Sequence, residues 1–284
     1  MAAERALSRK HQLQNMLVDM CIKRDGPNAP YYIFDNKEVK HLSNGIGFAN
    51  HNDATHIDTA KGRSPRLVGE GLSIIHLGNH REGGGKRASA RHAFVRTDAL
   101  FHDFETISEE KSHDLRFRPR PLDEINTSES NILSLAYNQG IVNRVLYPTD
   151  LRANPSIYMA HRTRMTPNYT VGGVALPFGE VQLEVDMTVE HEGHITVFEA
   201  KNWSAKRSDF AVYQLFLPYH LYSRKAEHDA RIKSIDCCYL VRKPLNKSQG
   251  GGSEIEVRRY TFDDPTDILS IRCLDAQRWR LKRE

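Results

Sequence analysis

The 284-residue chain has few cysteines and no long apolar segment, and both absences limit the class of protein. Its four cysteines form no C-x-x-C pair, so we expect buried thiols in a reducing compartment rather than disulfides or a zinc site. The longest apolar runs, such as residues 215–218, fall far short of the roughly 20 residues that span a membrane. The N-terminus has no export pattern, and the sequence therefore predicts a cytoplasmic protein without membrane association.

Nucleotide-binding motifs and recognisable metal-binding motifs are also missing. Glycine runs at 83–85 and 250–252 lack the context of a P-loop, and no Rossmann fingerprint occurs, so we do not expect an ATP-driven enzyme. Two histidine clusters, at 51–56 and 76–80, lack a third ligand at recognisable spacing. We expect them to be surface or hydrogen-bonding histidines.

The composition is that of a globular protein, with 39% hydrophobic residues, 27% charged residues and a formal net charge of +4. Basic residues gather at 78–92, where glycines predict a loop that is either solvated or ordered by phosphate. They also gather at 116–121 and 278–283. Prolines exclude a helix at 116–121, so we predict a linker there, between an N-terminal region (1–120) and a core (121–284).

Hydrophobic periodicity predicts an N-terminal α+β region followed by an α/β core. In the first region we expect a helix over 3–23 and strands over 31–34 and 72–77. In the core we expect a helix from a capping box at 126–129 to Pro148, with a weak point at Gly140, and a helix from Ser208 to about 224. The expected core strands are 156–160, 168–177, 181–190, 194–202, 235–242, 254–262 and 268–274.

Two alternating strands flank Glu192-Gly193 within residues 180–203. If this pair is a two-residue hairpin turn, His191 faces His194. Side chains alternate with period two, which predicts one polar and one apolar face. The apolar face would carry Leu183, Val185, Met187, Val189, Phe198 and Ala200.

On the polar face, the same count places Asp186 opposite Glu199 and Glu184 opposite Lys201. Directly opposed carboxylates lie about 5 Å apart and repel each other, whereas Mg²⁺ would bind between such oxygen ligands. Lys201 would then orient or help to deprotonate a water molecule. The alternative is a solvent-facing hairpin in which Lys201 and Glu184 form an ordinary ion pair.

Asp186, twelve further residues and then Glu199-Ala-Lys201 resemble the signature of the PD-(D/E)XK nuclease superfamily, which includes most type II restriction endonucleases. The resemblance covers about residues 125–265, although Val185 stands where a proline often precedes the aspartate. It implies a restriction-endonuclease-like core, which is a mixed central sheet flanked by helices.

The resemblance also implies roles for individual residues. Asp186 and Glu199 would ligate Mg²⁺, for which Mn²⁺ would substitute, and Lys201 would position the attacking water. Glu129 would be an accessory catalytic carboxylate or, alternatively, only part of the capping box. Glu184 is its rival as a further metal ligand.

The implied function is sequence-specific, Mg²⁺-dependent cleavage of double-stranded DNA to give 5′-phosphate ends. We expect a homodimer, with a DNA methyltransferase as genetic partner. The alternatives are a modification-dependent or structure-selective nuclease, or an inactive DNA-binding protein on this scaffold. The side chains expected to bind DNA are Gln214 (otherwise a plain helix-face amide), Lys86, Arg87, Arg91, Arg162 and Arg164.

Overall fold

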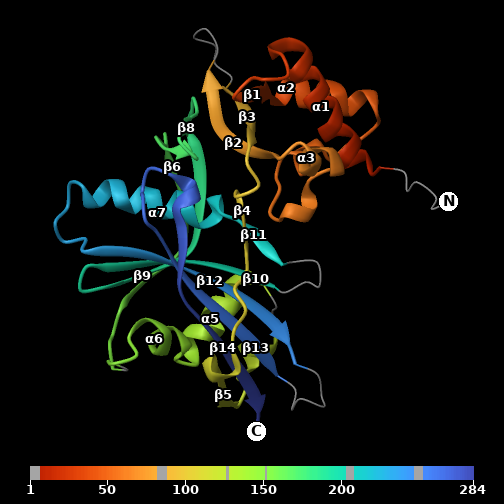
Figure 1. Cartoon of the computed structure of the whole chain (residues 1–284). Helices are drawn as coiled ribbons and strands as arrows, with labels where there is room; N and C mark the ends of the chain where they lie inside the picture. Colours follow the sequence, from red (N-terminus) through yellow and green to blue (C-terminus); the bar gives the residue numbers. More distant parts are fainter. Residues whose placement is uncertain (1–6, 82–87, 126–127, 151, 203–207, 246–251) are drawn as a thin grey trace.

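A seven-stranded mixed sheet forms the centre of the protein (Figure 1). The computed structural model describes residues 7–81, 88–125, 128–150, 152–202, 208–245 and 252–284. Across the sheet the strands are β5 (Ser112–Phe117), β14 (Ile271–Arg283), β13 (Ser253–Phe262), β12 (Ser234–Pro244), β10 (His194–Asn202), β9 (Val181–His191) and β6 (Ser156–Met165). The pairs β10–β12 and β14–β5 are parallel and the others are antiparallel.

Helices cover both faces of this sheet, which confirms the expected α/β architecture (Figure 1). Helix α5 (Glu129–Asn138) packs over the apolar cluster that contains Phe198 and Cys238. Helix α7 (Tyr213–Ala226) packs over the cluster that contains Val197 and Cys237. The adjacent cysteines therefore point to opposite faces, as strand alternation predicts, and all four cysteines are free thiols.

The N-terminal region is a second, three-stranded sheet with helices on one side. It contains α1 (Arg9–Asp25), β1 (Tyr31–Asp35), α2 (Asn36–Gly45), α3 (Pro65–Gly69), β2 (Leu72–Arg81) and β3 (Ala88–Arg96), with strand order β1-β3-β2. One face, with Phe34 and Phe94, packs under the helices. Ile75 and Ala93 on the other face belong to the same cluster as α7. The region is therefore packed on the core.

The structure changes two predictions for the basic segments. Within 78–92, predicted as a loop, the described residues belong to the paired strands β2 and β3, and the segment 82–87 lies outside the described residues. Within 116–121, predicted as a linker, residues 116–117 belong to β5. Since β5 pairs with β14, the large sheet takes strands from both sides of the boundary predicted at residue 120.

Three further predictions for the core are corrected. Gly140, at φ +69°, ends the long predicted helix, and α6 (Ile141–Leu146) starts anew after it. Ser208 does not cap a helix, because β11 (Asp209–Ala211) follows it and pairs with β4 (Phe101–Asp103). Residues predicted as strand 168–177 form only the short pair β7 (Thr170–Val171) and β8 (Val174–Ala175). No helix in the described part of the chain is long and apolar enough to cross a membrane.

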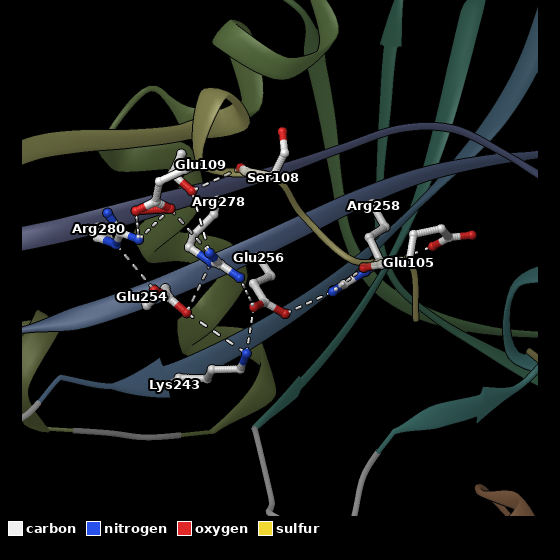
Figure 2. Close-up of polar contacts among 10 residues, drawn as sticks. Glu105, Ser108, Glu109, Lys243, Glu254, Glu256, Arg258, Arg278 and Arg280 are labelled. Atoms are coloured by element: carbon white, nitrogen blue, oxygen red, sulfur yellow. Dashed lines mark hydrogen bonds and ion pairs between the residues drawn. The ribbon is translucent and has the colours of Figure 1, made fainter. Parts of the chain in front are cut away.

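Charged side chains form a network on the sheet, as Figure 2 shows. Its members on the strands are Lys243, Glu254, Glu256, Arg258, Arg278 and Arg280, and we call them the sheet network. Glu256 and Arg258 are each only 4% exposed and lie 3.0 Å apart. Buried ions are tolerated when they are paired, and here each charge meets an opposite one.

The two sheets approach most closely at two glycines. The Asn79 amide donates to the Glu180 carbonyl at 2.8 Å. A Cβ on Gly78 would lie 2.6 Å from that carbonyl oxygen, and a Cβ on Gly179 would lie 2.3 Å from the Asn79 carbonyl oxygen. Only glycine allows this backbone contact.

Gly78→Ala is therefore expected to lower the free energy of unfolding by at least about 2 kcal/mol, through left-handed strain and the clash together. Chemical denaturation measures this loss. Gly71→Ala is the matched control, because Gly71 also has positive φ (+62°) but nothing lies within 4 Å of its Cβ position. Equal losses in the two variants would show that the close contact has no energetic consequence.

Candidate active site

The hairpin of β9 and β10 has the predicted turn. His191 pairs with His194, and Glu192 (φ +52°) and Gly193 (φ +87°) occupy the left-handed positions between them. The Cα pairs continue to Met187 opposite Phe198. Beyond them, the Asp186 carboxylate accepts a hydrogen bond from the Ala200 amide at 3.2 Å. The side chain of Asp186 therefore bonds to the backbone of β10 at the residue that follows Glu199.

The apolar residues of the hairpin do not share one face, contrary to the prediction. Leu183 and Val185 pack in the cluster under α7. Met187 and Phe198 pack in the cluster under α5. A sheet covered on both faces needs apolar side chains on each, so the hairpin serves two cores.

An open cleft of about 450 Å³ lies between this hairpin and α7. Six of the residues proposed from the sequence line it: Glu129, Glu184, Asp186, Glu199, Lys201 and Gln214. They come from four elements, α5, β9, β10 and α7. The structure thus brings together side chains that lie up to 85 positions apart in the sequence.

Lys201 is the centre of the charged groups. Its Nζ lies 2.7 Å from a Glu129 oxygen and 2.9 Å from a Glu199 oxygen. Burial alone would lower the pKa of Lys201, but the two carboxylates outweigh it and raise the pKa. The side chain is 15% exposed, so a charged ammonium is held at a fixed place in the cleft.

Glu129 is available for this contact because it does not complete a capping box. The N-cap of α5 is Ser128, whose hydroxyl accepts from the Asn131 amide, so Glu129 is the first helical residue rather than the third after the cap. Its carboxylate is bound to Lys201 instead. The ordinary ion pair between Lys201 and Glu184, weighed above as an alternative, is replaced by these contacts.

Asp186 and Glu199 form a coupled acidic pair. Burial raises the pKa of Glu199 to about 8, with Lys201 opposing the rise and Asp186 adding to it. Burial also raises the pKa of Asp186, whose side chain hydrogen-bonds Glu199. A cation bound between two neighbouring carboxyl groups whose pKa values are raised would favour their charged forms.

This pair suits Mg²⁺ better than a metal that needs an all-protein ligand set. Among the described residues, no group of three or more His, Cys, Asp or Glu side chains is arranged to hold a metal ion. Mg²⁺ binds through one or two carboxylates and completes its shell with water and phosphate. Asp186 and Glu199 supply such a pair of oxygen ligands, and they fit the ion.

Gln214 connects α7 to the carboxylates. Its Nε2 donates to a Glu199 oxygen at 3.3 Å, while its Oε1 is buried and has no hydrogen-bond partner in the part of the chain that the structure describes. An unpaired buried acceptor costs about 1–3 kcal/mol. The side chain therefore orients Glu199 and retains one unused acceptor within the cleft.

The basic residues proposed for DNA binding differ in position. Arg162 lies 3.0 Å from Glu184 and Arg164 lies 3.3 Å from Glu180, all of them exposed, along the β6–β9 edge. Glu184 is thus paired with an arginine rather than with the acidic pair. Arg91 lies on β3 beside Asp35, away from the cleft, and Lys86 and Arg87 lie outside the described residues.

The N-terminal region supplies a part of the cleft that the sequence did not predict. His56 lines the cleft, as do Tyr213, Gln182, Leu217 and Pro218. Tyr213 donates to Asp58 at 3.0 Å, and the Ala211 amide donates to the Asp58 carbonyl. No local pattern predicts this docking, because the partners are more than 150 positions apart.

Residues 96–280 match the model of a family that is described as a domain of unknown function, DUF6997. The match includes every cleft residue named above except His56. No curated protein and no solved structure matches the chain.

Proposed function

Because the chain belongs to the DUF6997 family, whose description states no activity, we propose its function from the cleft: Mg²⁺-dependent hydrolysis of phosphodiester bonds in double-stranded DNA. The observation that carries the proposal is a buried lysine held between two carboxylates, one of which, Glu199, is hydrogen-bonded to Asp186. Such a set can bind a cation, a phosphate and a water molecule side by side.

Each residue has a separable role in this reaction. Asp186 and Glu199 would hold Mg²⁺, which supplies charge stabilisation at the phosphoryl oxygens. The Lys201 ammonium orients the attacking water and offsets the negative charge that develops on the phosphate. Glu129 and Gln214 are positioning residues, since they act through Lys201 and Glu199.

The resemblance to the PD-(D/E)XK nucleases implies which bond breaks. The water oxygen attacks phosphorus in line, the P–O3′ bond breaks, and the products are a 5′-phosphate and a 3′-hydroxyl. One water proton is transferred to the leaving O3′ and the other to solvent. We propose cleavage of restriction type, because the N-terminal region lines the cleft and offers contacts beyond the reacting phosphate.

The test is incubation of the purified full chain with plasmid and phage DNA, with Mg²⁺ and with a chelator instead. We expect discrete fragments with Mg²⁺ and none with the chelator. Asp186→Asn keeps the shape of the side chain and should remove cleavage, whereas Lys111→Ala, at an exposed ion pair with Asp275, should not. A smear of fragments would support nuclease activity but contradict sequence-specific cleavage of restriction type. If methylated, branched and unmodified DNA all stayed intact, the proposal would be overturned.

A further inference from the structure

A smaller and more enclosed pocket of about 190 Å³ adjoins the cleft, and we call it the histidine pocket. It shares His56, Gln182, Tyr213 and Leu217 with the cleft. Tyr213 precedes Gln214, whose amide contacts Glu199. A group in this pocket would therefore adjoin the cleft that contains the acidic pair.

The histidine pocket and the cleft have opposite chemistry. Apolar side chains, including Ile57, Ile74 and Ile75, form much of the pocket wall. No Lys, Arg, Asp or Glu is among the described residues that line it, whereas four carboxylates and Lys201 line the cleft. A phosphate or a carboxylate would find no counter-ion there, so the pocket suits a neutral ligand.

Its size and its rings favour a flat ligand. An apolar cavity of about 150 Å³ accommodates benzene, so this pocket has room for one six-membered ring and its substituents. Tyr169, Tyr213, His56 and His76 present ring systems to it. Aromatic side chains stack on nucleobases at about 1–3 kcal/mol per base.

His76, which lines the pocket, also has an unpaired ring nitrogen. Its Nδ1 is buried and has no hydrogen-bond partner among the described residues. Burial, with His56 and His80 nearby, lowers the pKa of His76 to about 4, so the ring is neutral at pH 7 and has one donor and one acceptor nitrogen. A partner with its own donors and acceptors would satisfy this nitrogen.

We propose that the histidine pocket receives a single pyrimidine base turned out of the DNA duplex whose phosphate lies in the cleft. The proposal rests on the proposed function. His76 would hydrogen-bond the edge of the base, and the neighbouring rings would stack on its faces. Turning out a paired base costs a few kcal/mol, and turning out an unpaired base costs least. A duplex with an unpaired base should therefore bind more tightly than a fully paired one.

The test uses a short duplex with one unpaired cytosine next to a 2-aminopurine, whose fluorescence reports the unstacking of its neighbour, beside the fully paired duplex. The full chain is used without Mg²⁺, so that binding is read without cleavage. We expect about tenfold tighter binding of the unpaired duplex, with a fluorescence change, and no such preference for an unpaired purine. In His76→Phe, which keeps a ring and removes the nitrogen, the preference should fall to about twofold or less.

His194→Phe, at the turn end of β10, is the control and should keep the preference; unchanged denaturation midpoints verify that both variants fold. Two results would overturn the proposal that the pocket receives a base. One is equal binding of the two duplexes by the unaltered protein, and the other is an undiminished preference in His76→Phe. An equal preference for a purine would overturn the restriction to pyrimidines. DNA cleavage without this preference would overturn only the proposed binding of a base in the pocket. A preference without cleavage would overturn only the proposed nuclease activity.

Discussion

Lys201→Ala is expected to lower the rate of DNA cleavage by about a hundredfold to a thousandfold. This is the usual effect of removing one preorganised charge at a reacting group. The loss should be in kcat, because the ammonium acts on the developing charge and on the attacking water. Single-turnover cleavage of a plasmid by the variant and the unaltered protein measures it. Lys201→Arg should recover only part of the rate, since a guanidinium places its donors differently.

The sheet network supplies a matched control for this variant (Figure 2). Lys243 also contacts two glutamates, Glu254 and Glu256, on the same sheet, but it does not line the cleft. Lys243→Ala should therefore reduce stability and leave the cleavage rate per folded molecule within a few-fold. If both lysines lowered the rate alike, the effect of Lys201 would be one of sheet stability, and its role at the phosphate would be wrong.

Metal-free protein is expected to become less stable as the pH rises from about 5 to about 8. Burial raises the pKa of Glu199 to about 8 from its usual 4.5, so over this range the native state binds a proton that the unfolded state releases. Each pH unit in this window is worth about 1.4 kcal/mol, so we expect a loss of about 2–4 kcal/mol. Asp186, whose pKa burial also raises, acts in the same direction.

Urea denaturation across this pH range in the presence of a chelator measures the loss. Glu199→Gln should flatten the dependence, because the amide keeps the shape of the side chain without titrating. Lys201 does not confuse the result, since its raised pKa affects stability only above its usual value near 10.5. Mg²⁺ should restore stability more at pH 8 than at pH 5. A pH dependence equally steep in Glu199→Gln would contradict the assignment to this carboxyl group.

Local periodicity was sufficient to identify the centre of the candidate site. A two-residue turn fixes the register of the hairpin as far as Met187 opposite Phe198, and the next residues along each strand are Asp186 and Glu199. This is a short-range relation, which is why a single sequence was enough to predict it. Glu129 and Gln214 were implied by the resemblance to PD-(D/E)XK nucleases and not by local periodicity.

Features that depend on distant contacts could not be predicted in this way. His56 reaches the cleft only because residues near Asp58 dock on Tyr213, and nothing in either segment indicates the other. The end of β2 and the strand β3 were hidden by glycines and charges, although Gly78 is required by its contact with Glu180. The long apolar pattern around Gly140 suggested one helix, and the left-handed glycine produced two.

The N-terminal sheet and α7 pack in one apolar cluster, and this limits which parts of the protein can be replaced. A fragment that starts at residue 96 would contain the acidic pair and Lys201, but it would lack His56 and expose the apolar surface that Ile75 covers. The segment that we infer to select the DNA is thus also part of the hydrophobic core. Under the proposed function, new target preferences are then to be sought by exchanging side chains within the pocket, since replacing the whole N-terminal region would expose apolar surface of the core.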